Sequence, residues 1–477
     1  MPSLKKNYFY NLSYQIISLL LPFITTPYTS RILGADCIGI SSFTASIVNY
    51  FTLFGTLGIG LYGQREIAYY QNNKTEKSRV FWNLISLRTC TILISLGIYL
   101  IIIFSWHKYR LYFLIQTLTL IACLFDVTWV CQGEENFKIV VIRNIFFRLL
   151  SVIFLFGFIK SSDDLWKFIL MNCGITLFCN FSLFPYVLKK LDRCSVKNLS
   201  PFKYLKPVFL LFIPQIAIQI YTVLDKTMIG FITNSPYENG CYEQANKTVK
   251  MLLVVVTSLG TVVVPRMANL HAHGDSKTIQ QYLYRSFSFV FMVGLPMCTG
   301  LSCIASVFVP VFLGSGYDEV IPLLRIFSFL FIAIGLNNVI GVQYLIPVKK
   351  EKIFTYTVIA GAVSNLIMNM ILIPKYSAVG AAFASVVAES IITIIQFVYI
   401  HKMIKLKTIF FQSWKYFLAT GVMTVLIVLL KTLLNTNIIS LLILVILGII
   451  SYAIMLILLR DSLILSVITR FTRREAK

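Results

Sequence analysis

Apolar segments of membrane-spanning length recur along almost the whole of this 477-residue sequence. A helix needs about 20 predominantly apolar residues to cross a bilayer, and a backbone in lipid must satisfy its hydrogen bonds internally. Segments of this length without strict alternation therefore predict helices and not strands. We expect about fourteen of them, at residues 8–30, 38–62, 81–104, 111–132, 142–159, 165–187, 207–232, 248–270, 284–313, 321–346, 353–374, 378–400, 414–431 and 438–459.

The composition excludes an ordinary soluble enzyme. Apolar residues make up 57% of the chain and charged residues only 13%, with a mean hydropathy of +0.80. Soluble domains carry about 25% charged residues, and no stretch between the apolar segments is long enough for a soluble domain of usual size. The sequence therefore predicts an all-α polytopic membrane protein.

The formal net charge is +23. In a soluble protein this balance would suggest nucleic acid, but membrane proteins retain basic residues on their cytoplasmic loops. Lysines and arginines concentrate in alternate loops, as at 189–206 and 402–407. The positive-inside rule then places both termini in the cytoplasm, and no nucleic-acid partner is expected.

An internal repeat accompanies this pattern. Gly39 and Arg65, which flank the second apolar segment, correspond to Gly240 and Arg266, which flank the eighth, at an offset of 201 residues. We predict two six-helix lobes, residues 1–206 and 207–400, followed by a C-terminal helix pair and basic tail, 401–477. Parallel repeats of this kind are related by a two-fold axis along the membrane normal, with the substrate site expected between them.

Charged residues inside the apolar segments mark the candidate site, because each costs at least about 2.5–3.5 kcal/mol at the bilayer centre. Such residues usually face an aqueous cavity or a partner, although Arg88 and Arg148 lie close enough to the cytoplasmic side to snorkel. The acids are Asp126, Asp225 and Glu389, and the basic residues are Arg31 (at a helix end), Arg88, Arg148, Lys226 and Arg325.

Basic groups outnumber acids in these segments, which favours an anionic substrate. The planar guanidinium of arginine binds phosphate oxygens in pairs, so we predict that the five basic residues bind the substrate. Glu389, near the middle of its segment, is the best candidate for coupling transport to an ion, with Asp126 and Asp225 behind it. The alternative for Glu389 is a structural role, paired with an arginine or hydrogen-bonded while neutral.

No metal, cofactor or enzymatic site is expected. Most cysteines lie inside apolar segments, where a free thiol behaves as a small hydrophobe. His271 and His273 share a polar loop without further ligands nearby. The sequence shows neither a nucleophile–base constellation nor a glycine-rich phosphate loop.

Several motifs carry more information than composition. Residues 27–34 read PYTSRILG, 62–68 read YGQREIA, and 126–138 read DVTWVCQGEENFK. In this order they resemble signatures of the bacterial oligosaccharide flippases of the polysaccharide-biosynthesis (Wzx-type) family, with one residue inserted after Asp126. The segments 264–267 and 380–389 extend the resemblance into the second half.

The resemblance implies the fold of the multidrug/oligosaccharidyl-lipid/polysaccharide exporter superfamily, with two lobes around a V-shaped cavity. It implies a flippase in the bacterial plasma membrane that moves undecaprenyl-pyrophosphate-type lipid-linked oligosaccharides outward for capsule or O-antigen assembly. Membrane lipids and the repeat-unit polymerase are the implied partners. The last two helices resemble those that form a groove for the lipid tail in peptidoglycan-precursor flippases. On this hypothesis Asn49, Gln219 and Asn369 receive sugar hydroxyls.

Two alternatives stay open at this point. A cation-coupled multidrug antiporter of the same fold would favour a cavity dominated by acids and aromatic residues. A membrane glycosyltransferase or repeat-unit polymerase would usually show catalytic acids or a long outer loop. The paired acids at 163–164 and 318–319 lie in short predicted outer loops and are more simply explained as solvated charges.

Overall fold

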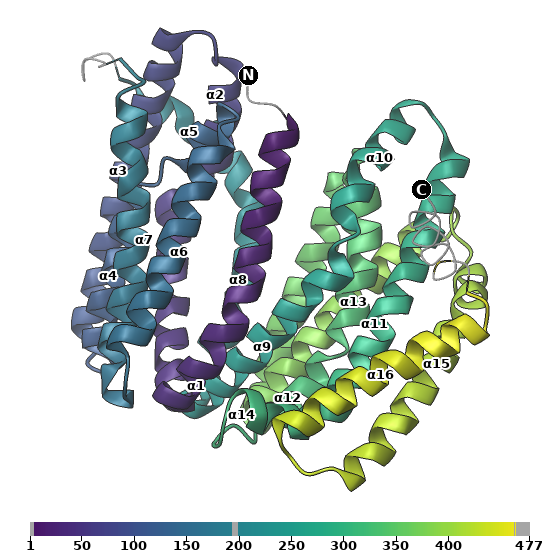
Figure 1. The fold of residues 1–477 in the computed structure, drawn as a ribbon. Helices are drawn as coiled ribbons and strands as arrows, with labels where there is room; N and C mark the ends of the chain where they lie inside the picture. Colours follow the sequence, from purple (N-terminus) through teal and green to yellow (C-terminus); the bar gives the residue numbers. More distant parts are fainter. Residues whose placement is uncertain (1–3, 193–198, 462, 464–477) are drawn as a thin grey trace. The chain divides into compact units, whose positions relative to one another are not determined.

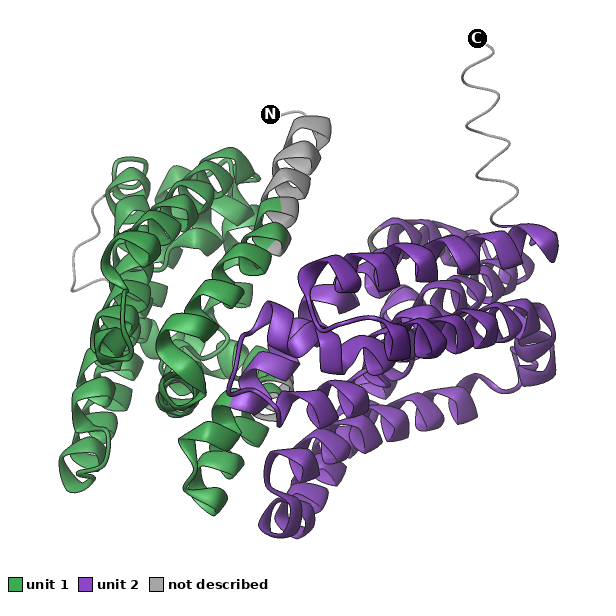
Figure 2. Ribbon diagram, turned by 60° about the horizontal axis from the view of Figure 1, so that its bottom comes forward, with its two compact units in different colours: residues 1–240 green, residues 241–477 purple. Residues whose placement is uncertain are grey.

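The computed structural model describes residues 4–192, 199–461 and 463, and every regular element within them is helical (Figure 1). The chain divides into two compact units, Met1–Gly240 and Cys241–Lys477 (Figure 2). The predicted all-helical class is therefore confirmed, and its physical reason is that lipid offers no hydrogen-bonding partners to a backbone.

Ten helical segments of the described residues are long and apolar enough to cross a membrane. A bent pair, Pro236–Thr257 with Val262–Ala272, passes the same test when taken together, with a bend of 44°. This protein is thus a multi-pass membrane protein.

Unit 1 contains the first helices and their connections. Its elements are α1 (Leu4–Thr56), α2 (Ile59–Tyr69), α3 (Lys74–Ser105), α4 (Arg110–Leu124), α5 (Thr128–Gly133), α6 (Phe137–Phe158), the short η1 (Ser162–Asp164), α7 (Leu165–Leu188), η3 (Pro201–Tyr204), α8 (Leu205–Thr233) and the start of α9 (Pro236–Thr257).

The long helix α1 reverses direction at one glycine. The backbone of Gly34 adopts φ 76° and ψ 170°, outside the helical region and accessible mainly to glycine. In Figure 1, α1 starts near the N label and reaches the opposite end of unit 1, and the chain then returns to α2. Gly34 therefore separates the first two predicted helices.

A second break lies between α4 and α5, inside the segment that we predicted as one helix at 111–132. The chain leaves the helix at Phe125 and re-enters it at Thr128. The indole of Trp129 packs in the core beyond it, stacked on Phe81 at 5.9 Å between ring centroids.

Unit 2 contains the rest of α9 and the remaining helices. The remaining helices are α10 (Gly260–Ala272), α11 (Ser276–Phe312), α12 (Val320–Phe327), α13 (Leu330–Asn337), the π-helix η4 (Asn338–Leu345), α14 (Glu351–Ile400), α15 (Leu406–Leu433) and α16 (Ile438–Leu458).

Helix α14 also contains a reversal. Ser377 has φ 50° and ψ −131°, a strained backbone for a residue with a side chain. A Cβ added to Gly380 would lie 2.5 Å from the carbonyl oxygen of Leu372. The helical segments on either side of Ser377 therefore meet too closely for a side chain at position 380.

The predicted C-terminal pair, α15 and α16, packs on α11. Met423, Ile427 and Leu444 form an apolar cluster with Val307 of α11. The hydroxyl of Tyr452 donates a hydrogen bond of 2.7 Å to the carbonyl oxygen of Met292. These contacts make the pair part of unit 2.

One pair of helix starts agrees with the predicted internal repeat: α2 begins at Ile59 and α10 at Gly260, an offset of 201 residues. The predicted lobe boundary at 206/207 lies one helix before the boundary between the compact units, because α8 packs against α1 and α2 within unit 1.

Candidate functional site

Unit 1 contains a polar cavity of about 670 Å³ between α5, α6 and α7. Its volume falls in the range of small-molecule sites, about 300–1,000 Å³. We call it the polar cavity of unit 1. Its lining residues are Gly60, Asp126, Thr128, Trp129, Gln132, Arg143, Asn144, Phe147, Arg148, Ser151, Asn172, Ile175, Thr176, Cys179 and Asn180.

Two arginines of α6 line this cavity. Arg148 donates a hydrogen bond of 3.0 Å from Nη1 to the hydroxyl of Ser18 in α1. Arg143 donates from Nη2 to Asn144 Oδ1 at 2.8 Å and to Thr128 Oγ1 at 3.4 Å. Its Nη1 is buried and has no hydrogen-bond partner among the described residues.

One acid, Asp126, also lines the cavity. Its Oδ1 accepts the backbone N–H of Thr128 at 3.1 Å, which stabilises the break before α5. Asp126 and Arg148 are thus two sequence-predicted residues that the structure brings to one cavity.

Arg88 lies behind the break instead of lining the cavity. Its side chain is only 2% exposed, and its Nη1 donates to the backbone carbonyl of Asp126. A cation at this position satisfies a carbonyl group that the end of α4 leaves without a helical partner. This geometry gives Arg88 a role in holding the break.

The other predicted cations do not line this cavity. Arg31 is exposed on α1, and Lys226 is half-buried on α8. Arg325 is exposed on α12 of unit 2. Within unit 1, the carbonyl oxygen of Lys226 accepts a hydrogen bond of 2.9 Å from Asn239.

Sequence reasoning missed Arg143 and the polar residues of α7. Asn172, Thr176 and Asn180 recur every four residues, a spacing that places them on one face of a helix. This spacing is visible in the sequence and indicates a polar face on the helix. Whether that face lines a cavity depends on which helix packs opposite α7, and only the tertiary structure supplies this information.

Glu389 belongs to a polar cluster in unit 2. Its side chain is 8% exposed, and Oε2 accepts a hydrogen bond of 3.0 Å from Asn337 Nδ2. Gln396 Nε2 donates to Asn337 Oδ1 at 2.9 Å and to Thr357 Oγ1 at 3.1 Å. The π-helix η4 begins one residue after Asn337, and such π segments are frequent at functional sites.

Two further predictions concern buried polar residues. Asp225, a coupling candidate, is 6% exposed on α8. Asn369, predicted to receive sugar hydroxyls, is buried in α14, where its Nδ2 donates to Asn365 Oδ1 at 3.1 Å. Asn369 is therefore part of a packed helix and not of an open surface.

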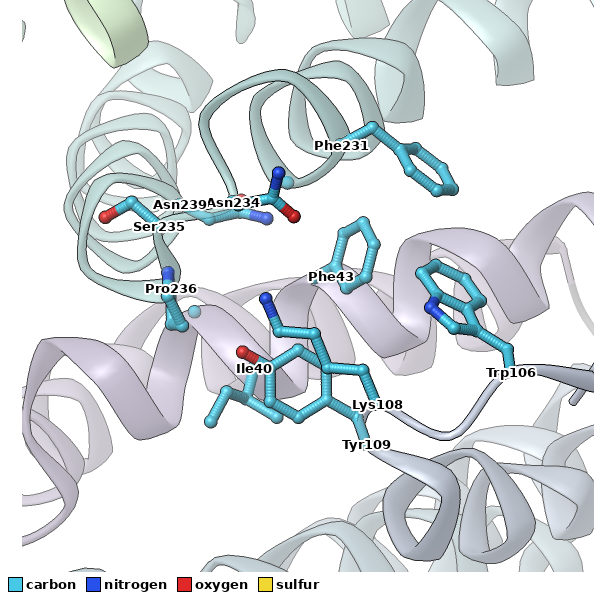
Figure 3. Close-up of a pocket in the computed structure, with 12 residues that line it drawn as sticks. Ile40, Phe43, Trp106, Lys108, Tyr109, Phe231, Asn234, Ser235, Pro236 and Asn239 are labelled. Atoms are coloured by element: carbon cyan, nitrogen blue, oxygen red, sulfur yellow. The ribbon is translucent and has the colours of Figure 1, made fainter.

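A second cavity lies where α1, α8 and α9 meet in unit 1 (Figure 3). Its volume of about 20 Å³ accommodates little more than one water molecule. Phe43, Trp106 and Phe231 pack at its wall, with the rings of Trp106 and Phe231 stacked at 5.3 Å. This cavity is a packing feature and too small for a substrate.

A partly buried ion-pair cluster lies at one end of unit 1. Glu134, which belongs to the motif at 126–138, accepts from Lys77 at 2.7 Å and from Lys190 at 2.8 Å. Burial alone would raise the pKa of Glu134, but the hydrogen bonds and charges of Lys190 and Lys77 outweigh burial and hold the pKa below its usual value. The cluster joins the ends of α3, α5 and α7.

We expect Glu134→Gln to destabilise the protein by on the order of 3 kcal/mol, because Lys77 is left buried beside a neutral group. Since the carboxyl pKa is lowered by folding, this stabilisation is complete above pH 4.5 and is lost as the pH falls through the lowered pKa. Thermal unfolding of the purified protein between pH 3 and pH 7 measures both effects. Glu135→Gln, at the exposed neighbour, is the control; equal melting temperatures for the two variants would contradict the prediction.

Within the described residues, no group of three or more His, Cys, Asp or Glu side chains is arranged to hold a metal ion.

Comparison with known proteins identifies the family. Residues 4–271 match the polysaccharide biosynthesis protein family, and residues 207–460 match the lipid II flippase MurJ family. A putative O-antigen transporter of Escherichia coli K12 is 24% identical over 83% of this chain and 97% of its own length. A putative O-antigen transporter of Shigella dysenteriae is 25% identical over 79% of this chain and 94% of its own length.

Solved structures share the fold. The inward closed conformation of the lipid II flippase MurJ superposes with a TM-score of 0.76 at 17% identity, over 95% of this chain and 99% of that chain. An inward-facing multidrug resistance MATE family transporter of the MOP superfamily superposes with a TM-score of 0.60 at 13% identity, over 79% of this chain and 93% of that chain. These proteins are named as transporters or flippases, in agreement with the expectation that the chain is not an enzyme. Because the polysaccharide biosynthesis protein model covers more than half of the chain, this protein belongs to that family, the Wzx-type flippases.

Proposed function

We propose that this protein is a flippase that moves polyprenyl-pyrophosphate-linked oligosaccharide repeat units from the cytoplasmic to the outer leaflet of a bacterial plasma membrane. The observation that carries the proposal is the alignment with putative O-antigen transporters over 97% and 94% of their lengths. The lipid II flippase fold supports it, because that protein's name also describes a lipid-linked substrate.

The proposed chemistry is charge shielding. A pyrophosphate with two or three negative charges must cross the bilayer while its lipid tail stays in lipid. Arginines bind phosphate oxygens in pairs, and Arg148 lines a polar cavity of sufficient size. We retain Arg31, Arg88, Arg148, Lys226 and Arg325 as the proposed source of positive potential along the path, with alternating access as the proposed mechanism.

We also propose fourteen crossings with both termini in the cytoplasm. The reversals at Gly34 and Ser377 divide two of the ten candidate segments. The 29-residue α8 and the bent pair of α9 and α10 supply the remaining two. The lobes 1–206 and 207–400 and the C-terminal pair 401–477 then follow the internal repeat.

The membrane potential favours the proposed direction. An inside-negative potential assists outward movement of an anion by about 2.3 kcal/mol per charge per 100 mV. Downstream consumption of the repeat unit by a polymerase would add to this driving force. The remaining problem is the return of the empty carrier, for which Glu389, Asp126 and Asp225 are the proposed coupling groups.

Removal of the protein tests the function. We expect the lipid-linked repeat unit to accumulate in the cytoplasmic leaflet, measured as radiolabelled material that is extractable from membranes but protected from a hydrolase added outside spheroplasts. Normal polymer export without accumulation would overturn the proposal. Export of cationic drugs, with polymer unaffected, would indicate the multidrug antiporter alternative instead.

Charge removal tests the proposed cations. Alanine at Arg31, Arg148, Lys226 or Arg325 is expected to lower export at least tenfold with normal membrane insertion, because the anion loses its counter-charge. Arg88→Ala is expected to lower the yield of folded protein as well, since the carbonyl of Asp126 loses its donor. The control is Lys352→Ala, at an exposed lysine of α14. Wild-type export by all five variants would contradict the proposed basic path.

A further inference from the structure

The polar cavity of unit 1 is built by two helix faces that carry matching chemistry. On α7 the face presents Asn172, Thr176 and Asn180, and on α6 the cavity is lined by Asn144, Arg148 and Ser151. Amide and hydroxyl groups in the middle of two membrane helices are expensive unless they have hydrogen-bonding partners. Their concentration around one cavity indicates a polar content for that cavity.

Two lining residues carry buried donors for which the described residues supply no acceptor. They are Nη1 of Arg143 and the indole Nε1 of Trp129. Burying a charged donor without a partner costs more than burying a neutral one. Both atoms are covered by neighbouring atoms, so neither contacts the contents of the cavity directly, and it is the charge that Arg143 places at the cavity wall that favours an anionic ligand.

The charges of the cavity agree with this chemistry. The charged lining residues are Arg143, Arg148 and one acid, Asp126, which gives the lining one net positive charge. A phosphate group provides several acceptor oxygens and a compensating negative charge. The cavity therefore matches phosphate better than it matches a cation or a neutral apolar ligand.

The hydroxyl oxygens of Thr176 and Ser151 can accept hydrogen bonds from a part of the ligand other than its phosphate. Thr176 Oγ1 donates to the carbonyl of Asn172 at 2.8 Å, and Ser151 Oγ donates to that of Arg148 at 2.6 Å. Because these protons are used within the helices, the two oxygens remain able to accept hydrogen bonds. Sugar hydroxyls are donors of the required kind, and the apolar ring of Phe147 lies on the same lining.

We propose that the polar cavity of unit 1 binds the head group of the lipid-linked substrate, with Arg143 and Arg148 holding phosphate and Asn172 and Thr176 contacting the adjacent sugar. This inference rests on the proposed function. It differs from the sequence-based expectation of a site between the halves, because all the residues of this cavity belong to unit 1.

Binding of two probes to the full-length protein in detergent tests the proposal. One probe is farnesyl pyrophosphate, and the other is farnesyl pyrophosphate linked to N-acetylglucosamine; inorganic pyrophosphate as competitor separates free phosphate from a lipid head group. Arg143→Gln is expected to weaken both probes at least tenfold. Asn172→Leu combined with Thr176→Val is expected to weaken only the sugar-linked probe, by about tenfold.

A stability measurement separates binding from folding. Because Arg143→Gln removes a partly buried charge whose covered Nη1 has no acceptor among the described residues, its melting temperature is expected to equal or exceed that of the wild type. A structural arginine would lose stability and binding together. Arg79→Gln and Thr117→Val, which lie outside the cavity in the same unit, are the matched controls.

The outcomes are separable from those of the proposed function. Wild-type affinity of Arg143→Gln for both probes, with flipping intact, would overturn the head-group site and leave the flippase standing. An equal loss for both probes in the Asn172 and Thr176 double variant would overturn the sugar contact. Absence of repeat-unit accumulation in cells without the protein would overturn the flippase itself, whatever the cavity binds.

Discussion

Replacing Gly39 with alanine is expected to give the largest loss of folded protein of any single methyl addition in unit 1. A Cβ at this position would lie 1.8 Å from the carbonyl oxygen of Pro236, and a Cβ on Gly240 would lie 1.9 Å from that of Ala35. Both obstacles are backbone atoms, so no side chain can move aside. Overpacking costs about 1–3 kcal/mol where side chains can adjust, and we expect more here.

Thermal unfolding and size-exclusion chromatography of the purified variant measure the loss of folded protein, and polymer export in cells measures the loss of function. Gly240→Ala is expected to reproduce the effect, because Ala35 and Gly39 are related to Pro236 and Gly240 by the offset of 201 residues and the contact is reciprocal. The control is Gly97→Ala in α3, where nothing lies within 4 Å of the added methyl. That substitution should stabilise the helix by about 0.5–1 kcal/mol. A wild-type melting temperature for Gly39→Ala would contradict the close approach.

Replacing Glu389 with glutamine is expected to leave substrate binding intact and to slow turnover at least tenfold. Glutamine keeps the shape and an oxygen that can accept from Asn337 Nδ2, but it cannot gain or lose a proton. A cavity with net positive charge resists closing without its anion, and a carboxylate that ionises during the return would balance that charge. Without this titration, the return of the empty carrier should limit the rate.

Flipping of a labelled lipid-linked repeat unit in reconstituted vesicles across pH 6–8 measures this effect. The coupling hypothesis expects a pH-dependent rate for the wild type and a slow rate with altered pH dependence for Glu389→Gln. The control, Glu351→Gln, changes an exposed acid at the start of the same helix. Identical rates for wild type and Glu389→Gln at every pH would leave Glu389 with a structural role in its hydrogen-bonded cluster.

The proposed head-group site changes how the five predicted cations are viewed. Arg148 keeps its predicted place beside a polar cavity, whereas Arg88 lies behind the helix break with its charge directed at a backbone carbonyl. Arg143, which lies five residues before Arg148, is a second arginine on the lining of the same cavity. Position in a hydropathy profile did not separate these three roles.

The sequence by itself determined the helical class, the membrane location, the family and the internal repeat. Hydropathy is a local property of about 20 consecutive residues, and the family motifs are contiguous stretches such as 27–34 and 62–68. The offset of 201 residues also separates the starts of α2, at Ile59, and α10, at Gly260. None of these features requires knowledge of which helices touch.

The tertiary structure alone decided which side chains share a cavity. The polar face of α7, at 172, 176 and 180, acquires its meaning only because α6 places Arg143 and Arg148 on the same cavity. At the break between α4 and α5, Arg88 donates a hydrogen bond to the backbone carbonyl of Asp126. Asn369 is buried and hydrogen-bonded to Asn365, so it does not lie on an open surface. Such assignments depend on the rotation and packing partners of each helix, which nonlocal contacts set and which a single sequence does not record.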